Sequence, residues 1–155
     1  MRDMEGKDHW LEGAITNLLN DPDVGAVVSN LRDVTNRVEA EQKLKESEER
    51  YRAVVDNNAD AIIITSLDGT IRSFNPAACR IFLYEEEEMT RLKYHELRDE
   101  EDPRWEEEHS ALEGKRDYRG ELCFRRRGSV SFPAEVSINV IKLTSGETIL
   151  ASIIR

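Results

Sequence analysis

The chain has 155 residues, which is enough for one compact domain with some linker. Its formal net charge is −10 with 35% charged residues, and this excludes nucleic acid as a partner, because binding phosphates needs a positive surface. The two cysteines are too few for a disulfide scaffold and match no zinc spacing, so we expect a reducing, cytoplasmic setting. No apolar run reaches the length needed to span a bilayer, so we expect this segment to make no membrane contact.

The first predicted element is a β-hairpin between about Asp8 and Arg32. Two β-permissive stretches flank Asn20-Asp21-Pro22-Asp23, which is a strong turn signal. A lone hairpin is only marginally stable in water, so this one must pack on something. We expect it to dock on an exposed sheet edge or face, its own or a neighbour's, by strand addition.

A long helix is predicted next, because residues 34–58 contain no Gly or Pro and are rich in Ala, Glu, Lys, Gln and Arg. Its apolar stripe is narrow, with Leu44 and Tyr51 one heptad apart, and this pattern is typical of pairing with one partner helix. We therefore predict a homodimer, either through this linker helix, with a coiled-coil seam formed by Val38, Leu44, Tyr51 and Val55, or through a sheet edge. A solvated linker helix without a partner is the alternative.

The remaining residues predict an α+β domain. Two short strands, 61–65 and 70–74, are joined by Asp68-Gly69. Asn75 fits an N-cap and Pro76 a first helical residue. Short helices follow, with an acidic helix over 85–92, a charged loop over 98–102 and a helix from Pro103 that Gly114 ends.

Three further strands complete the predicted sheet, at 119–126, 130–143 and 148–154. The middle one alternates over eleven residues, with Val136 and Ile138 on the apolar face and Glu135 and Ser137 on the other, as in a half-buried antiparallel strand. The order of two strands, helices and three strands predicts a five-stranded antiparallel sheet with short helices on one face.

Residues 47–155 carry several short motifs in a fixed order. The motifs are Ser47-Glu48-Glu49-Arg50-Tyr51-Arg52, Asp60-Ala61-Ile62, Asp68-Gly69 followed by Asn75-Pro76-Ala77-Ala78, and Arg126-Arg127-Gly128-Ser129 followed by Phe132-Pro133-Ala134-Glu135-Val136-Ser137. Together these motifs resemble those of a PAS domain. One departure is Arg127, where the family usually has Asp. The N-terminal hairpin is similar to the last two strands of such a domain, and Asp33-Val34-Thr35 matches its D-x-T exit motif.

The resemblance implies three parts: a hairpin remnant of an upstream PAS domain (1–33), a linker helix (34–57) and one PAS domain (58–155). We expect a fragment of a longer signalling protein, or an unusually trimmed stand-alone gene. The resemblance also implies a cavity between sheet and helices. Its expected lining is apolar throughout: Ile62, Ile64, Phe74, Ile81, Phe82, Met89, Leu92, Leu122, Phe124, Val136 and Ile138.

Within the PAS family, some members bind flavin covalently and others bind haem, but neither cofactor is expected here. Cys79 lies one helix too early for a flavin adduct, and His109 lies only five residues before Gly114 and follows three glutamates, so it is expected to face solvent. His95 is expected in a loop, His9 lies at the start of the chain, and Trp105 is expected in the core or the pocket wall. The acidic runs 85–88, 99–102 and 106–108 are interpreted as solvated faces, not metal sites.

No phosphate-binding loop or catalytic triad pattern is present in the sequence, so we expect no enzyme activity; kinase or cyclase output would lie in another domain. The sequence identifies no cofactor. The predicted function is a sensory or signal-relay module of a multi-domain bacterial-type protein, associated with a histidine kinase of a two-component system. It would bind a small apolar ligand or a partner and pass a conformational change through the helix. The alternative is a ligand-free dimerisation or spacer module.

Overall fold

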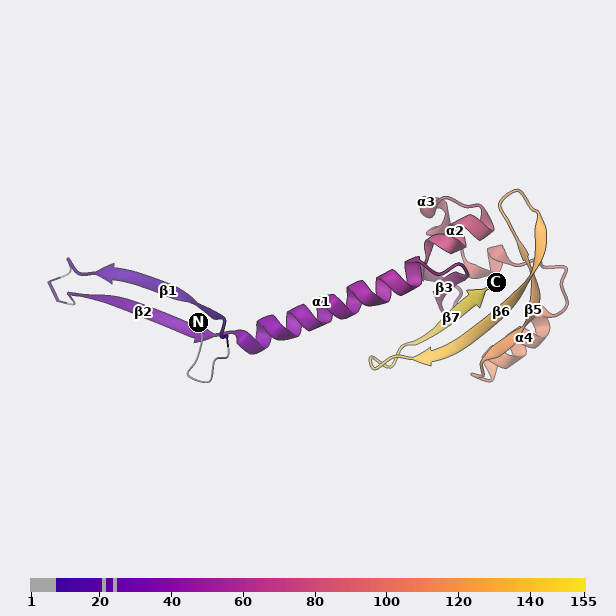
Figure 1. Cartoon of the computed structure of the whole chain (residues 1–155). Helices are drawn as coiled ribbons and strands as arrows, with labels where there is room; N and C mark the ends of the chain where they lie inside the picture. Colours follow the sequence, from indigo (N-terminus) through magenta and orange to yellow (C-terminus); the bar gives the residue numbers. More distant parts are fainter. Residues whose placement is uncertain (1–7, 21, 24) are drawn as a thin grey trace. The chain divides into compact units, whose positions relative to one another are not determined.

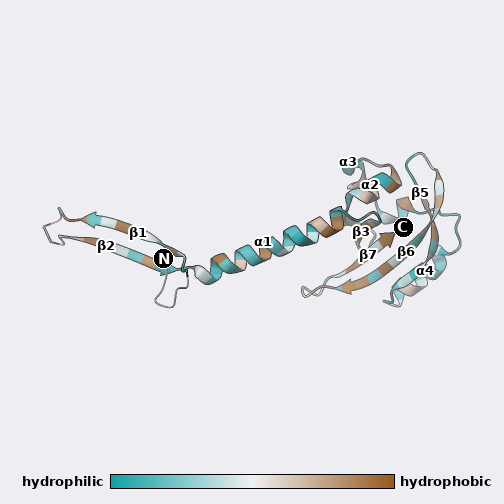
Figure 2. Cartoon of the chain, in the orientation of Figure 1, coloured by the Kyte–Doolittle hydropathy of each residue, from teal (hydrophilic) through white to brown (hydrophobic). Residues whose placement is uncertain are grey.

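The computed structural model describes residues 8–20, 22–23 and 25–155. The chain divides into an N-terminal unit, Met1–Tyr51, and a C-terminal unit, Arg52–Arg155. The helix α1 (Thr35–Asp56) contributes residues to both (Figure 1). Figure 2 shows that α1 is mostly hydrophilic with isolated hydrophobic residues, which agrees with the predicted narrow stripe.

The N-terminal unit contains the predicted hairpin, formed by β1 (Leu11–Leu18) and β2 (Ala26–Asp33). The strands pair antiparallel in one continuous register from Leu11↔Asp33 to Leu18↔Ala26. Of the expected turn, Asp21 lies outside the described residues. The hairpin forms a sheet of its own, so its docking partner remains a prediction.

The C-terminal unit is built on an antiparallel sheet of β3 (Ala61–Ser66), β4 (Ile71–Phe74), β5 (Tyr118–Arg125), β6 (Ser131–Lys142) and β7 (Thr148–Ile154). The strand order is β4-β3-β7-β6-β5. The last strand therefore lies in the middle of the sheet, paired with β3 on one side and β6 on the other. The predicted α+β class and five-stranded sheet are confirmed.

Four short helical segments connect β4 to β5: α2 (Pro76–Phe82), α3 (Glu86–Met89), η1 (Tyr94–Leu97) and α4 (Trp105–Glu113). Their buried residues pack in one hydrophobic core with the inward-facing residues of the sheet. The predicted caps are correct: Asn75 precedes α2 with Pro76 as its first residue, and Gly114 follows α4.

Two local expectations need correction. The acidic helix expected over 85–92 is only one turn long, Glu86–Met89, and His95 lies in the 3₁₀ turn η1, not in a loop. Isolated β-bridges pair Lys93 with Thr70 and Arg98 with Phe124, so the chain is non-helical on both sides of η1, and only short turns fit between these points. The Asp-Gly turn between β3 and β4 forms as predicted, with Gly69 at a φ of 80°.

Candidate functional site

Most of the residues predicted to line a pocket lie in the core of the C-terminal unit. Six are buried there: Phe82, Met89, Leu122, Phe124, Val136 and Ile138. Three more are partly buried and pack against them: Phe74, Ile81 and Leu92. These side chains come together on the helical side of the sheet.

The prediction for Ile62 and Ile64 is wrong. Ala61, Ile63 and Thr65 are the buried residues of β3, while Ile62 and Ile64 are half-buried on the opposite face. The reason is that side chains alternate along a strand, and Ile63 takes the inward position. On the outer face, Ile62 lies opposite Ile153 of β7.

Aromatic rings fill the centre of this core. Phe124 is fully buried and contacts Trp105, Phe82 and Tyr94 edge-on, with ring centroids 5.2, 5.7 and 6.5 Å away. Trp105 is thus a core residue; the core and the pocket wall were the two expected locations. An open space lies at one end of the sheet, beside Thr65 of β3 and Thr148 of β7.

That space is a cavity of about 400 Å³ lined by the β3–β4 turn, η1, α4 and β7; we call it the η1–α4 cavity. Leu67, Leu112 and Leu150 supply its apolar walls. The other side chains are polar or charged: Thr65, Asp68, Tyr94, His95, Arg98, His109, Glu113, Lys115 and Thr148. Its volume is in the range of small-molecule pockets in proteins.

Beside this cavity lies a buried polar cluster of Tyr94, Arg98 and Glu108, which the sequence analysis did not foresee. Nη2 of Arg98 donates to Oε1 of Glu108 at 3.1 Å, and Glu108 is 0% exposed. The guanidinium of Arg98 stacks over Trp105, at 4.4 Å from the ring centroid, and also over Tyr94, at 5.3 Å. This charged cluster departs from the expected pocket lining, which is apolar throughout.

The cluster retains hydrogen-bonding capacity. Within the described part of the chain, the Tyr94 hydroxyl, Nε of Arg98 and Oε2 of Glu108 are buried and have no well-formed hydrogen bond. Burial raises the pKa of Glu108, with the charge of Arg98 acting against it. Burial also raises the pKa of Tyr94, which the nearby Ser152 hydroxyl offsets only in part. Buried polar atoms are normally paired with protein groups or ordered water, so these three atoms can each take part in a further hydrogen bond.

A sequence signal for Glu108 did exist. Trp105, Glu108 and Leu112 are spaced by three and four residues, which places them on one face of α4. Glu108 belongs to the acidic run 106–108, and such a run favours a solvated face. This interpretation is wrong for Glu108, which is buried. Asp102 is likewise buried, where its Oδ2 accepts the amide of Cys123 at 2.7 Å.

A second polar centre, Asn75, connects the end of α1 to the domain. Its Oδ1 accepts the amides of Ile62 and Ala78, at 2.9 and 3.1 Å. Its Nδ2 donates to the carbonyls of Val55 in α1 and Asp60 before β3, both at 3.0 Å. All its polar capacity is used, and one fully buried side chain thereby fixes three elements.

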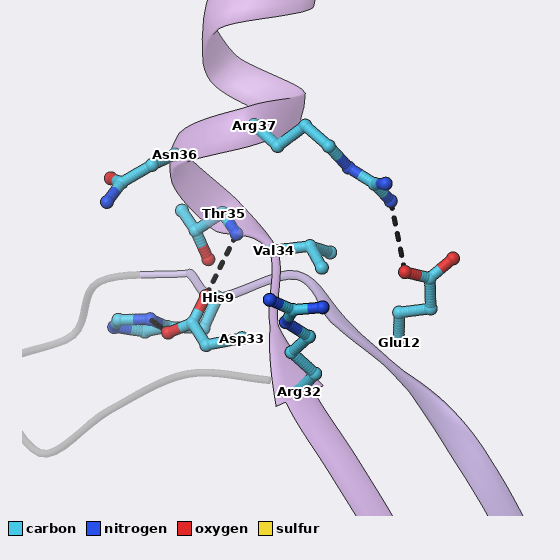
Figure 3. Close-up of a pocket in the computed structure, with 8 residues that line it drawn as sticks. All are labelled: His9, Glu12, Arg32, Asp33, Val34, Thr35, Asn36 and Arg37. Atoms are coloured by element: carbon cyan, nitrogen blue, oxygen red, sulfur yellow. Dashed lines mark hydrogen bonds and ion pairs between the residues drawn. The ribbon is translucent and has the colours of Figure 1, made fainter.

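At the hairpin–helix junction of the N-terminal unit, polar side chains gather around the first turn of α1 (Figure 3). Asp33 accepts the amide of Thr35 at 2.9 Å and faces His9 at 2.8 Å. These hydrogen bonds, those from Thr35 first, lower the pKa of Asp33 to about 2. Arg37 pairs with Glu12 at 3.0 Å, so α1 is anchored to both strands.

The remaining candidates are Cys79 and the histidines, of which His95 and His109 line the η1–α4 cavity. Cys79 lies partly buried on α2, and burial raises the pKa of its thiol, which lowers its reactivity. His109 is exposed and lies 3.3 Å from Glu113. In the described ranges, no three His, Cys, Asp or Glu side chains are grouped to hold a metal ion. None of the described helices is both long and apolar enough to cross a membrane.

These features define a PAS domain: an antiparallel sheet of order β4-β3-β7-β6-β5, short helices between its second and third strands, and a long helix leading into it. The PAS fold family matches residues 49–153, and the chain belongs to that family. The resemblance noted in the sequence is thus confirmed.

Three known proteins illustrate the relationship. A PAS domain of an HTR-like protein from Haloarcula marismortui is 26% identical with a TM-score of 0.62, over 76% of this chain and 97% of that one. A domain of a sensory box sensor histidine kinase/response regulator from Geobacter sulfurreducens is 25% identical with a TM-score of 0.59, over 72% and 96%. Sporulation kinase E of Bacillus subtilis (strain 168) is 47% identical over 58 residues, which is 37% of this chain and 8% of the kinase.

Proposed function

We propose that this chain is a sensory or signal-relay module of a multi-domain signalling protein of the histidine-kinase type. In this proposal, a small ligand or partner binds the C-terminal unit and the resulting change passes along α1. The similarity to PAS domains of a sensor kinase and to a segment of a sporulation kinase supports the setting. The chain spans only a small part of that kinase, and catalysis belongs to other domains in this scheme.

The η1–α4 cavity is the proposed binding site. It has apolar walls of leucine and many polar or charged groups, which include Tyr94, Arg98, His109 and Lys115. This differs from the wholly apolar lining expected from the sequence, and it favours a small ligand that carries several polar groups beside an apolar part. Such a ligand would bias the packing of η1 and α4, both of which line the cavity.

Asn75 is the observation that carries the relay. It holds the carbonyl of Val55, in the last turn of α1, together with β3 and α2. A change in packing on the helical side of the sheet therefore reaches α1 through a buried, fully hydrogen-bonded side chain. Couplings of this kind typically amount to about 1–3 kcal/mol.

Hydrogen exchange measured by mass spectrometry tests the relay. The purified chain is screened for compounds that raise its melting temperature, and exchange over residues 52–56 is then compared with and without the best compound. We expect binding to change exchange there, and Asn75→Asp, which keeps the acceptor but loses the donor, to abolish that change while binding persists. If every bound compound leaves residues 52–56 unaffected in the unmodified chain, the relay is refuted.

The second candidate, a ligand-free dimerisation or spacer module, is favoured by one observation. Leu44 and Tyr51 of the proposed seam are each 60% exposed, whereas Val38 and Val55 are partly buried. Large apolar side chains in heptad spacing on a free helix surface are suited to a partner helix. A chain that dimerises through α1 and responds to no compound would support this function over sensing.

A further inference from the structure

The N-terminal hairpin β1–β2 repeats the strand pair β6–β7 of the PAS domain. The two segments, 11–32 and 134–155, align without an insertion or deletion in either strand or in the loop between them. Four aligned positions carry the same residue: Glu12 and Glu135, Ile15 and Ile138, Ser29 and Ser152, Arg32 and Arg155. Equal loop lengths are significant because loop length sets hairpin register.

The register of the two pairs is the same. Ile15 lies opposite Ser29 in the hairpin, and Ile138 lies opposite Ser152 in the domain. Glu12 lies opposite Arg32, and Glu135 exchanges two backbone hydrogen bonds with Arg155, at 2.9 and 3.2 Å. The repeat therefore extends from sequence to strand pairing.

The two pairs differ in what covers them. Ile138 is 0% exposed and Ser152 is 1% exposed, because the helices of the domain lie over that face. The equivalent Ile15 is 70% exposed. Side chains alternate along each strand, so Leu11, Val27 and Leu31 share the face of Ile15, and all three are exposed. We call this uncovered apolar surface the Ile15 face.

Both edges of the domain's own strand pair are also occupied. β7 pairs with β3 along its outer edge, and β6 pairs with β5. In the hairpin, the corresponding edges of β2 and β1 have no strand partner among the described residues. A strand pair with one apolar face and two free edges can complete a sheet that lacks two strands.

Charge at one edge indicates the chemistry of the partner. Arg155, at the end of β7, pairs with Asp60 just before β3, with Nη2 and Oδ2 2.8 Å apart. The equivalent Arg32 makes no ion pair in the described part of the chain. A strand that binds β2 as β3 binds β7 would place its own acidic residue beside Arg32.

We propose that β1–β2 serves as the last two strands of a second PAS-type domain, one that lacks its own. A β3-like strand with an acidic residue at its start would pair with β2, a β5-like strand would pair with β1, and short helices would cover the Ile15 face. α1 then begins where one domain ends and finishes where the next begins. This inference is independent of the ligand proposed above, so either can fail alone.

The chain itself supplies the probe. A copy of residues 52–131 is joined in front of His9, so that β1–β2 follows the copied β5 as β6–β7 follows β5 in the domain. We expect hydrogen exchange over 11–18 and 26–33 to slow by at least about 100-fold relative to the unextended chain, as strands become part of a core. A control protein, in which the copy continues through its own residues 132–155 before α1, gives the exchange rates expected for fully protected strands.

Matched variants define the surface. In the extended chain, Ile15→Asp should abolish the protection, whereas Ala14→Asp, on the other face of the same strand, should leave it within about threefold. Arg32→Asp should weaken it, and Asp60→Arg in the copied segment should restore it. The proposal is overturned if residues 132–155 are protected from exchange in the control protein but the hairpin is not protected in the extended chain.

The unextended chain provides a second test, namely whether another copy of the chain covers the Ile15 face. We expect free exchange in the hairpin amides and no effect of Ile15→Asp on the sedimentation coefficient. If Ile15→Asp instead dissociates a dimer, a second copy of the chain covers the Ile15 face, and the proposal is wrong.

Discussion

The side-chain amide of Asn75 donates a hydrogen bond of 3.0 Å to the carbonyl of Val55. This carbonyl lies in the last turn of α1, where it also accepts the backbone amide of Asn58 at 3.3 Å. The same side chain caps α2 and accepts the amide of Ile62. The N-cap anticipated from the sequence is therefore also the point at which the helix α1 enters the domain.

Asn75→Ala should lower the free energy of unfolding by about 2–4 kcal/mol, because it removes four side-chain hydrogen bonds at a fully buried position. Urea unfolding followed by circular dichroism measures this. Asn57→Ala is the control, since Asn57 is exposed and its side chain donates only to the carbonyl of Ala53. Equal losses in the two variants would contradict the role given to Asn75.

Ile63→Ala and Ile64→Ala form a matched pair on one strand. Ile63 is fully buried, so its truncation should cost about 2–5 kcal/mol, while Ile64 lies partly exposed on the other face and should cost about 1 kcal/mol. Chemical denaturation at one temperature measures the free energy of unfolding of both variants and of the unmodified chain. A larger loss for Ile64 would mean that the strand faces the other way.

That pair also shows where sequence reasoning stopped. The order of elements, the caps and the alternation of β6 follow from patterns along the chain. In β3, however, residues 61–64 are all apolar, so no alternation identifies which of them face inward. Glu108 was missed for a related reason: its surroundings are supplied by Arg98 and by strands distant in the chain, and no local pattern contains them.

Asp102 should make the domain sensitive to acid. Its pKa is lowered from 3.8 to about 2, chiefly by the hydrogen bond from Arg104 and also by the amide of Cys123. A carboxylate whose folded pKa lies below its unfolded value stabilises the fold above pH 3.8, and this contribution is lost as the pH falls towards 2. Since Arg104 is partly exposed, the contribution should be about 1 kcal/mol.

The measurement compares the free energy of unfolding of the unmodified chain and Asp102→Asn across that pH range. Asp33 and Asp68 also have a lowered pKa, so both proteins will lose stability in acid, and the quantity of interest is the difference between them. That difference should shrink as Asp102 becomes protonated. A constant difference at all pH values would show that Asp102 acts only through hydrogen bonds that protonation leaves intact.

Leu44→Glu combined with Tyr51→Glu should convert a dimer to a monomer, because two charges would enter the proposed seam of α1. Sedimentation velocity over a range of concentrations reports the change. Both residues are exposed, so the stability of the folded monomer should change by less than about 0.5 kcal/mol. Gln42→Glu with Ala53→Glu adds the same charge off the seam and should leave association unaltered.

The chain contains two tryptophans, and they lie in different parts of it. Trp10, at the base of the hairpin, is 60% exposed, whereas Trp105 is 8% exposed and stacks against the guanidinium of Arg98. The molecule thus carries one solvent-exposed and one buried tryptophan, whose emission maxima differ. With Trp10→Phe, and with excitation at a wavelength that tyrosine does not absorb, the emission comes from Trp105 beside the η1–α4 cavity, so occupancy can be followed without attaching any dye.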